Sequence, residues 1–324
     1  MVLKTIKTID AVGHILCHDI TKIVPGEFKG ALYKKGHIVK EEDIEILLNI
    51  GKDELYVWAE TEGLLHENDA AVRLKDIITG SNLSISKISE GKINLIADCD
   101  GVLKINLDDL FKLNMIDEII VATKNNLSFI KKGDIVASTR VIPLLIDENK
   151  ILEAERITNS LVINLIPLKK KKIAIVTTGN EVFYGRIKDK FQEVLLPKFE
   201  KYGSKFIGQT IVPDDIKKIE NAITSYLEDG AELIICTGGM SVDPTDITPQ
   251  AIMNTGSEIV AYGMPLLSGS MTLIAYNKNV PIIGLPAGVL FAEKSSIDVI
   301  LYRLLSYDLI TREEVSLYGN GGLL

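Results

Sequence analysis

The segment CTGGMSVDPTDITP, residues 236–249, gathers residue types that can hold a charged ligand. Gly238 and Gly239 directly follow an apolar run, so the backbone can approach a ligand closely and its N–H groups can form an anion-binding turn. Ser241 adds a hydroxyl group and Asp246 a carboxylate. Mg²⁺ prefers one or two carboxylates together with phosphate oxygens. The segment therefore indicates either a site for a phosphorylated ligand with Mg²⁺ or an ordinary strand-to-helix connection.

Four other segments in the second half of the chain have similar chemistry at the ends of predicted strands. TTGNEV places Gly179 and Glu181 after a strand, and VPDD places Asp214 and Asp215 before a helix. Acids at a helix N-terminus are also stabilised by the helix dipole, so this pair has a structural explanation of equal weight. Small residues lie at two more strand ends, in LLSGSMT (266–272) and GLPAGV (284–289). Each segment alone is compatible with a plain turn, but together they favour a binding site.

Alternating strand and helix patterns after Pro167 would position these segments. Continuous apolar runs such as KIAIV and LIIC predict strands that are buried on both faces. Helical patterns lie between them, for example DDIKKIENAITSYLEDG, which begins with acids and ends at Gly230. This alternation of strands and helices predicts an α/β fold with a mostly parallel, doubly wound sheet. Ligands of such sheets bind at the carboxyl ends of the strands, where all these segments lie.

The pattern changes near residue 165, which sets the predicted domain boundaries. Residues 1–165 are predicted to form an α+β, strand-rich module, and residues 166–310 the α/β domain. Residues 311–324, which end in GNGGLL, are expected to be a loose C-terminal tail. The residues of the N-terminal module do not indicate a function.

The N-terminal module contains one group of potential metal ligands. HENDAA opens a predicted helix over residues 66–80, with His66 and Asp69 on one side of the helix and Glu67 beside them. Acids at a helix start explain two of these three residues without a metal ion. A second helix is predicted over residues 41–51, whereas the sequence after residue 80 indicates strands with little helix between them.

The composition limits the class of protein. The 324 residues are 46% hydrophobic and 25% charged, with a formal net charge of −8, so neither nucleic acid nor a membrane surface is expected as a partner. The three cysteines have no pairing pattern, and no apolar stretch is long enough for a signal peptide or a membrane span. A cytoplasmic location is therefore expected. The lysine run 169–172 is expected to be a solvated linker rather than a nucleic-acid patch.

In their order and spacing, TTGNEV, VPDD, CTGGMSVDPTDITP, SGSM and GLPAGV resemble the molybdopterin-binding domain of molybdopterin molybdenumtransferases, gephyrin-type proteins and molybdopterin adenylyltransferases. The resemblance covers about residues 170–305. It implies a three-layer α/β/α fold, a homo-oligomer, and molybdopterin or adenylyl-molybdopterin as the ligand. The overall layout, with GHILCHDIT, KKGHIV and HENDAA ahead of the domain, is similar to clostridial-type molybdopterin-binding proteins.

The resemblance implies roles for individual residues. Glu181, Asp214 and Asp246 match acids that serve catalysis, and Glu181, Asp215 and Asp246 match the ligands of a magnesium ion. The residues implied in binding the pterin or its phosphate are Thr178, Gly179, Gly238, Gly239, Ser241, Ser268, Gly269, Ser270 and Pro286. In molybdenumtransferases this magnesium-dependent chemistry inserts molybdate and releases AMP.

The sequence departs from the molybdenumtransferase pattern in several places, among them the absence of the serine-methionine-aspartate-glycine signature in its N-terminal part. No lysine occurs between Ala261 and Asn277, where those enzymes carry lysines, and LPAGV replaces their LPGNP. GRIKDK with DITPQA is closer to the adenylyltransferase branch, in which Asp189 would be a further site acid, although a solvated helix acid is the simpler explanation of this residue. Three functions stay open: magnesium-dependent molybdenum insertion or a related transfer, a non-catalytic carrier or sensor of the cofactor, and a CinA-type nucleotide pyrophosphatase.

Overall fold

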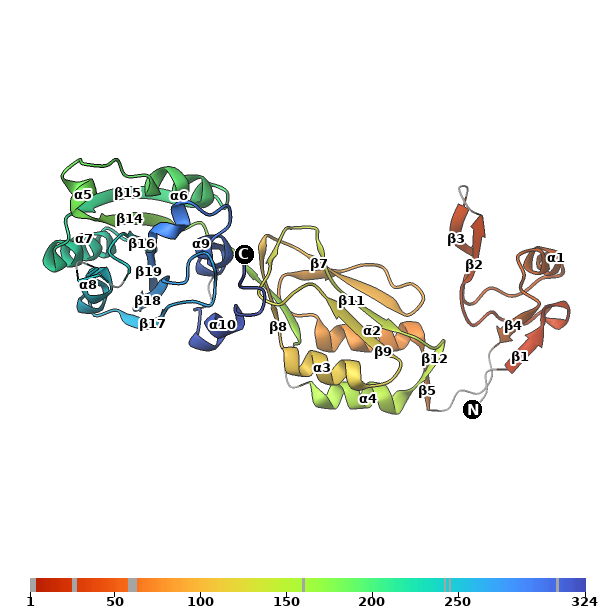
Figure 1. Cartoon of the computed structure of the whole chain (residues 1–324). Helices are drawn as coiled ribbons and strands as arrows, with labels where there is room; N and C mark the ends of the chain where they lie inside the picture. Colours follow the sequence, from red (N-terminus) through yellow and green to blue (C-terminus); the bar gives the residue numbers. More distant parts are fainter. Residues whose placement is uncertain are drawn as a thin grey trace. The chain divides into compact units, whose positions relative to one another are not determined.

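The computed structural model describes residues 4–24, 28–57, 63–158, 161–241, 243–244, 246–306 and 309–324. The chain forms two compact units (Figure 1). Unit 1 comprises Met1–Asp98, Lys104–Asn126 and Lys132–Asn164, and unit 2 comprises Cys99–Leu103, Leu127–Lys131 and Leu165–Leu324. Each unit has its own sheets and helices.

A six-stranded sheet forms the centre of unit 2, in the order β15-β14-β16-β19-β18-β17. Its strands are β14 (Lys172–Thr178), β15 (Lys205–Val212), β16 (Leu233–Thr237), β17 (Glu258–Tyr262), β18 (Leu273–Asn277) and β19 (Val280–Leu285). β15, β14, β16 and β19 are parallel, whereas β18 is antiparallel to β17 and β19. The predicted α/β fold with a mostly parallel sheet is confirmed.

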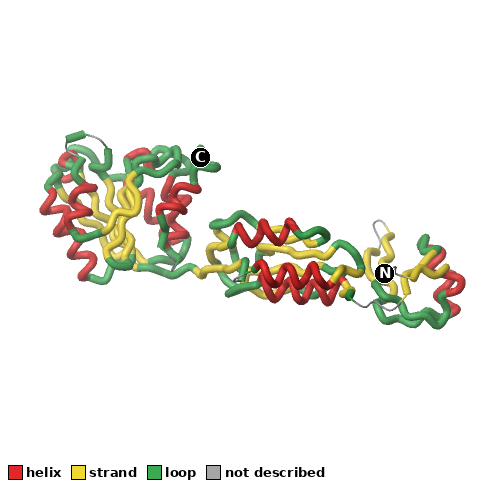
Figure 2. The backbone as a smooth tube through the Cα atoms, turned by 90° about the horizontal axis from the view of Figure 1, so that it is seen from below, coloured by secondary structure: helices red, strands yellow, loops and turns green. Residues whose placement is uncertain are grey.

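Helices cover both faces of this sheet, as the view in Figure 2 shows. One face carries α6 (Phe191–Glu200), α9 (Ser296–Leu304) and α10 (Arg312–Leu317), and the other carries α7 (Ile216–Glu228) and α8 (Thr248–Asn254). Strand periodicity explains the division, because Ile173 and Ile175 pack on the first face and Ala174 and Val176 on the second. Burying each large aliphatic side chain contributes roughly 1.5–3 kcal/mol, so the sheet holds the three layers together.

Two details of unit 2 differ from the sequence prediction. The prediction lacked strand β17, and it treated residues 311–324 as a loose tail. The tail instead contains α10, whose Val315 is buried, and a bridge between Leu267 and Leu323. Backbone hydrogen bonds from Leu267 N to Gly322 O and from Leu324 N to Leu267 O, both 2.8 Å long, hold the tail in place. The tail is therefore an ordered part of unit 2.

Short connecting elements complete the second half. α5 (Asn180–Phe183) follows β14, and the 3-10 helix η2 (Ala287–Leu290) follows β19. Pro197 lies inside α6, which continues to Glu200.

A separate three-stranded sheet has the strand order β10-β8-β13. They are β8 (Gly101–Ile105), β10 (Phe129–Ile130) and β13 (Ile163–Pro167).

Unit 1 is an α+β assembly of small sheets. Its main sheet has the order β6-β7-β11-β9, and the pairs β1-β4, β2-β3 and β5-β12 are antiparallel. The strands are β1 (Lys4–Lys7), β2 (Ile20–Val24), β3 (Phe28–Tyr33), β4 (Glu54–Val57), β5 (Leu64–His66), β6 (Leu83–Ile85), β7 (Lys92–Ala97), β9 (Ile119–Thr123), β11 (Ile135–Val141) and β12 (Leu145–Asp147).

The helices of unit 1 confirm two predictions and correct a third. They are η1 (Thr8–Asp10), α1 (Glu41–Asn49), α2 (Glu67–Ile78), α3 (Leu107–Met115) and α4 (Glu148–Ile157). α1 and α2 lie where helices were predicted. The expectation of little helix after residue 80 was wrong, because side chains cap two short amphipathic segments. Asn106 accepts a hydrogen bond from Asp109 N, and Asp147 accepts one from Asn149 N.

None of the helices in the described part of the chain has the length and apolar character needed to cross a membrane.

Candidate functional site

The segments singled out in the sequence meet at one edge of the sheet of unit 2. β14, β15, β16 and β19 are parallel, so the turns that follow them lie at the same, carboxyl edge. β18 runs in the opposite direction, which places the preceding loop, residues 266–272, at this edge too. Ligand sites of open α/β sheets form at such an edge. The structure therefore brings together the five segments on which the site prediction rests.

The turn after β16 requires glycine at two successive positions. Gly238 has a φ of +84°, and a Cβ atom there would lie 2.2 Å from the backbone oxygen of Thr178. Gly239 has a φ of +57°, and its Cβ would lie 2.7 Å from Thr248 Oγ1. Thr248 Oγ1 donates to Gly238 O at 2.9 Å and lies 3.0 Å from Thr178 Oγ1. The buried threonines thus fix the turn, and the glycines allow this close approach.

The backbone N–H and C=O groups of this turn differ in their partners. Within the described residues, Gly239, Met240 and Ser241 make no backbone hydrogen bond through their N–H groups. Tyr262, at the end of β17, donates its hydroxyl to Met240 O at 3.1 Å and to Ser241 O at 3.3 Å. The described hydrogen bonds thus hold the turn through its carbonyl groups. The sequence prediction missed Tyr262, because strand β17 was itself missed.

Tyr262 also reports on the charge around the turn. Its pKa is raised, chiefly by burial and further by the nearby carboxylate of Asp246. The phenol therefore stays protonated and keeps donating to the turn. Cys236, at the end of β16, is fully buried, and burial raises the pKa of its thiol to about 12. A thiol with this pKa is a poor nucleophile at neutral pH.

The loop before β18 packs against the start of α9. Gly269 has a φ of +115°, and a Cβ there would lie 2.4 Å from Ser296 Oγ. Thr272 Oγ1 donates to Gly269 O at 2.7 Å and lies 2.6 Å from Ser296 Oγ. Ser268 donates its hydroxyl to Gly288 O at 3.4 Å, which connects this loop to the turn after Pro286. Ser268 and Gly269 are thus joined to the turn that follows Pro286, and Ser270 lies in the same loop as these two residues.

The acids of the edge have different partners. A Cβ at Gly179, whose φ is +140°, would lie 2.8 Å from Glu181 Oε1, so the Glu181 carboxylate folds back over this glycine. Asp214 Oδ2 accepts from Asn180 N at 3.0 Å, and Asn180 Oδ1 accepts from Asp214 N at 3.3 Å. This reciprocal pair joins the turns after β14 and β15. No pattern in the sequence indicates this role of Asn180.

Asp215 and Asp246 each accept a backbone hydrogen bond. Asp215 caps α7 by accepting from Lys218 N at 3.1 Å, as the helix-start alternative predicted. Asp246 Oδ2 accepts from Asp243 N at 2.9 Å and so shapes its own loop. Among the described residues, no group of three or more His, Cys, Asp or Glu side chains is arranged to hold a metal ion. The metal ligands predicted from the resemblance stay a prediction.

A buried polar chain lies beneath the edge. Gln209 Nε2 donates to Thr177 Oγ1 and to Asp189 Oδ2, both at 2.8 Å, and Thr237 Oγ1 donates to Thr177 Oγ1 at 3.0 Å. Asp189 also accepts from Phe191 N at 3.1 Å at the start of α6. Asp189 therefore has a structural role that explains its presence. Whether it also meets a ligand stays a prediction.

The histidine of HENDAA has structural partners in unit 1. His66 Nδ1 accepts from Asn68 N at 3.1 Å and caps α2, and His66 Nε2 lies 2.8 Å from Cys17 O. Burial, the largest cause, lowers the pKa of His66. Both ring nitrogens are therefore already engaged, which favours the structural reading of this segment over a metal site.

The fold and the edge define the class of this region as a three-layer α/β/α domain with a glycine-containing turn at the carboxyl edge. Residues 174–306 match the family described as a probable molybdopterin binding domain. This match confirms the resemblance seen in the motifs of this part of the chain. Residues 5–59 match a second family, described as a domain of unknown function (DUF8806).

Curated relatives share parts of this chain. A CinA-like protein of Picosynechococcus sp. is 32% identical over 78 residues, which are 24% of this chain and 19% of that protein. A molybdopterin molybdenumtransferase of Synechococcus elongatus is 23% identical over 114 residues, which are 33% of this chain and 28% of that protein. The chain thus spans less than a third of the length of either relative.

Similar solved structures cover the same part of the chain. The protein CinA from Thermoplasma acidophilum is 17% identical, with a TM-score of 0.35, over 41% of this chain and 98% of that chain. The tungsten cofactor synthesizing protein MoaB from Pyrococcus furiosus is 18% identical, with a TM-score of 0.35, over 42% of this chain and 96% of that chain.

Proposed function

We propose that residues 174–306 bind a phosphorylated pterin, either molybdopterin or adenylyl-molybdopterin, at the carboxyl edge of the sheet. The glycine turn after β16 carries this proposal. Its N–H groups make no backbone hydrogen bond within the described residues, and Gly238 and Gly239 leave no side chain over it. A phosphate group accepts hydrogen bonds from such amides. The Ser241 and Ser270 hydroxyls would add further donors, and Thr178, Ser268, Gly269 and Pro286 would lie beside the pterin.

A magnesium ion would balance the charge of this ligand, since the edge itself is acidic. Asp214 and Asp246 each use one carboxylate oxygen, Oδ2, for a backbone N–H group, which leaves Oδ1 for a metal ion. Glu181 lies over Gly179 at the same edge. These acids, with Asp215 as a further candidate, fit a cation that takes its other ligands from phosphate and water. The bound ion would stabilise charge that develops on the phosphoanhydride.

The reaction that fits this arrangement is a magnesium-dependent transfer in molybdenum cofactor assembly. Adenylyl-molybdopterin would be the substrate, with AMP as the leaving group and molybdate as the incoming metal oxyanion. The chain's own residues would hold the phosphates and position the carboxylates, and no protein nucleophile is needed. Cys236 fits that view, because its thiol is fully buried with a pKa of about 12.

The experiment incubates the full chain with adenylyl-molybdopterin, molybdate and Mg²⁺ and measures AMP by chromatography. Asp246→Asn keeps an oxygen that accepts from Asp243 N, so the loop is retained while the charge is lost. We expect AMP release to fall about 100-fold, since metal stabilisation of charge is worth several kcal/mol. Asp229→Asn, at the exposed C-terminal end of α7, is the matched control and should leave the rate unchanged. Unchanged turnover in Asp246→Asn would remove this carboxylate from the mechanism.

Two other functions use the same edge and are distinguished by the same assay. A carrier or sensor would bind the pterin tightly without releasing AMP when molybdate is added. A CinA-type pyrophosphatase, which the CinA-like relatives favour, would hydrolyse ADP-ribose or a nicotinamide nucleotide and show no pterin affinity. The proposal also includes a homo-oligomer, which light scattering on the purified full chain tests.

A further inference from the structure

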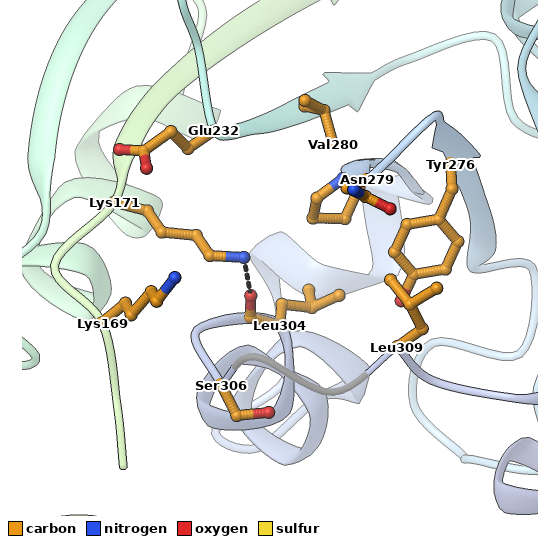
Figure 3. A pocket seen from close by; sticks show the side chains of 10 residues that line it. Lys169, Lys171, Glu232, Tyr276, Asn279, Val280, Leu304, Ser306 and Leu309 are labelled. Carbon is orange, nitrogen blue, oxygen red and sulfur yellow. Dashed lines mark hydrogen bonds between the residues drawn. The ribbon is translucent and has the colours of Figure 1, made fainter. Parts of the chain in front are cut away.

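A cavity of about 430 Å³ lies at the opposite, amino edge of the sheet of unit 2 (Figure 3). Lys169, Lys171 and Glu232 are the charged residues of its described lining. The run 169–172 was expected to be a solvated linker, which is wrong for Lys169 and Lys171 because both are partly buried. Lys171 Nζ donates to Leu304 O at 2.6 Å, and Lys169 also has an interaction of its own. These lysines therefore already have partners in the protein.

A second cavity, of about 500 Å³, adjoins the candidate site of unit 2. Tyr262 and the residues after it line this cavity together with Ser270 and part of α10. β17 is parallel to β19, because β18 is antiparallel to both, so the residues after β17 lie at the carboxyl edge. Tyr262 also donates its hydroxyl to the glycine turn. The same side chain therefore borders the glycine turn and this cavity.

Arg312 lies on the inward face of α10. It lines the cavity together with Val315 and Ser316, which are three and four positions further on and so lie on the same side of the helix. Val315 is fully buried, and Glu314 Oε2 pairs with the buried Arg303 Nη2 at 2.6 Å. These contacts fix α10 on unit 2. The exposed Arg312 side chain is thereby held at the cavity.

The donors of Arg312 and Ser270 have no partner in the described part of the chain. Arg312 O accepts from Ser316 Oγ at 3.0 Å, but the described hydrogen bonds and ion pairs include none from the Arg312 guanidinium. Ser270 O accepts from Met264 N at 2.8 Å, whereas neither the N–H nor the hydroxyl of Ser270 donates to a described group. A guanidinium carries several N–H donors and no acceptor. Two separate segments of unit 2 thus offer donors to one cavity.

The positive charge of this cavity is local to Arg312. Arg312 is the charged residue of the described lining, to which the neighbouring Glu313 does not belong. Asp246 is the acid that acts on the lining: burial, and after it the Asp246 carboxylate, raises the pKa of Tyr262. Asp246 Oδ2 accepts from Asp243 N at 2.9 Å and forms no described ion pair with Arg312. A single anionic group would therefore match the cation.

We propose that this cavity binds a tetrahedral oxyanion, which accepts hydrogen bonds from Arg312 and Ser270. The planar fork of an arginine matches a phosphate-like group with two parallel hydrogen bonds. Ser270 adds a hydroxyl and an N–H group from another segment, and a tetrahedral anion has enough oxygens to accept from both. Arg312 lies outside residues 174–306, so the family match does not account for this cation.

The oxyanion has two possible sources with the same chemistry. It is either free in solution or the phosphate of an organic ligand, whose body the rest of the cavity would hold, since the volume is in the range of pockets for small molecules. The second source rests on the proposed function, because the ligand would then be the phosphorylated pterin. The first source does not depend on it.

The simpler alternative is a solvated arginine whose aliphatic stem covers the apolar Val315. This role explains why Arg312 lies on the inward face of α10. It does not explain the unpaired donors of Ser270 in the same cavity. It also predicts that removing the charge of Arg312 leaves the binding of every anion unchanged.

The test titrates the full chain with inorganic phosphate, with sulfate and with adenylyl-molybdopterin by isothermal titration calorimetry. Arg312→Gln should weaken binding of the ligand that supplies the oxyanion about tenfold, because a charge-assisted hydrogen bond is lost. Arg312→Lys keeps the charge without the fork and should weaken it several-fold. Arg156→Gln is the matched control, since it removes another exposed arginine, on α4 of unit 1, and it should bind like the wild type.

Modification by phenylglyoxal, an arginine reagent, reports the contact directly. Peptide mass spectrometry measures how fast each arginine reacts. The ligand that supplies the oxyanion should slow the reaction of Arg312 several-fold and leave that of Arg156 unchanged. A role in packing alone would not produce this protection.

The titrations also distinguish the two sources. A loss of phosphate and sulfate binding in Arg312→Gln assigns the cavity to a free oxyanion, and a loss for adenylyl-molybdopterin alone assigns it to the phosphate of that ligand. The proposal is overturned if Arg312→Gln changes the binding of none of the three, if Arg156→Gln has the same effect, or if both arginines are protected equally. A wild type that binds phosphate through Arg312 but binds no pterin would refute the proposed function and leave this site intact.

Discussion

The two edges of the six-stranded sheet have opposite chemistry. At the carboxyl edge, glycines expose backbone N–H groups and the nearby side chains are acids. At the amino edge, the side chains of Lys169 and Lys171 line a cavity and Arg303 is buried in α9. The same strands connect both edges, so the difference arises from the turns and helix ends alone. A charged ligand would therefore meet different partners at the two edges: backbone N–H groups and carboxylates at one, and two lysines with a glutamate at the other.

The edges also differ in how they would tolerate substitution. Gly238 is fixed by backbone atoms, because a Cβ there would meet Thr178 O. Lys171 is fixed by a single bond from a flexible side chain to Leu304 O. Changes at the carboxyl edge should therefore affect fold and ligand together. Changes in the amino-edge cavity should therefore affect the fold less.

Arg303 is expected to give the largest effect on stability. It is 1% exposed, donates from Nη1 to Ser306 Oγ at 2.8 Å, and pairs from Nη2 with Glu314 Oε2 at 2.6 Å. Arg303→Met leaves the Glu314 carboxylate without its partner, which costs about 3–5 kcal/mol. Chemical denaturation followed by circular dichroism measures this loss. Adding Glu314→Gln should recover part of it, and a double variant no more stable than the single one would contradict this account.

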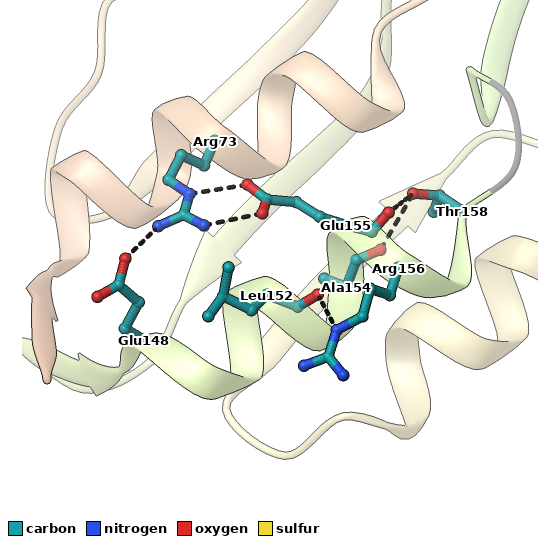
Figure 4. Close-up of polar contacts among 7 residues, drawn as sticks. All are labelled: Arg73, Glu148, Leu152, Ala154, Glu155, Arg156 and Thr158. Carbon is teal, nitrogen blue, oxygen red and sulfur yellow. Dashed lines mark hydrogen bonds and ion pairs between the residues drawn. The ribbon is translucent and has the colours of Figure 1, made fainter.

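Arg73 in unit 1 provides the comparison for Arg303 (Figure 4). It joins α2 to α4 by donating from Nε and Nη2 to Glu155 at 2.7 and 2.8 Å and from Nη1 to Glu148 at 2.8 Å. Its side chain is 28% exposed, and those of its partners are 33% and 41% exposed. Water can replace much of this network, so Arg73→Met should cost only about 1 kcal/mol. Equal losses at the two arginines would show that burial does not decide the effect.

Gly238→Ala is expected to have the next largest effect. The new Cβ would lie 2.2 Å from Thr178 O at a φ of +84°, so both overpacking and backbone strain act. Together they should destabilise unit 2 by about 3 kcal/mol and abolish binding of adenylyl-molybdopterin. The control is Gly230→Ala, whose φ is +77° with nothing within 4 Å of a Cβ, so that only strain of about 1 kcal/mol remains. Similar losses in both variants would mean that the close approach to Thr178 is unimportant.

Thr248→Val tests the hydrogen bond that holds the glycine turn. The substitution removes the donor to Gly238 O while nearly preserving shape, and it should cost about 2 kcal/mol. Thr139 in unit 1 is the matched control, because it is equally buried and its Oγ1 has no hydrogen-bond partner among the described residues. Thr139→Val should therefore be neutral or stabilising. A stable Thr248→Val that still binds ligand would show that the turn does not depend on this hydroxyl.

The carboxyl edge was largely predictable from sequence, and the amino edge was not. Buried apolar strands and the glycines after them produce a strong local pattern, and β14 and β16 lie where they were expected. Adjacent acids do not reveal their partners, so Asp214, which pairs with Asn180, and Asp215, which caps α7, could not be told apart. The different roles of Asp214 and Asp215 depend on contacts that only the folded sheet creates.

Elements defined by tertiary contacts were also missed. β17 is a short strand and the outermost one of its sheet. α3 and α4 are short helices that depend on caps and packing more than on helical periodicity. In the run 169–172 all four side chains are identical, so only the direction of the extended chain decides which lysines enter the cavity. Local sequence carries no such information.

The smallest expected effect is a pH dependence of stability at the amino edge. Burial lowers the pKa of Lys171 in the folded state, so between that value and the ordinary lysine value of 10.5 the unfolded chain binds more protons. Stability from this group therefore rises with pH across that window. Lys169, Glu232 and Tyr276 also line the cavity. Burial is the chief cause that raises the pKa of Tyr276, so this group makes stability fall as pH rises.

The informative quantity is thus the difference in the free energy of unfolding between the wild type and Lys171→Met, measured by denaturation from pH 8 to pH 10. The advantage of Lys171→Met should shrink as pH rises, whereas Lys172→Met should show a constant difference; a constant difference for both would mean that Lys171 is not desolvated by the cavity.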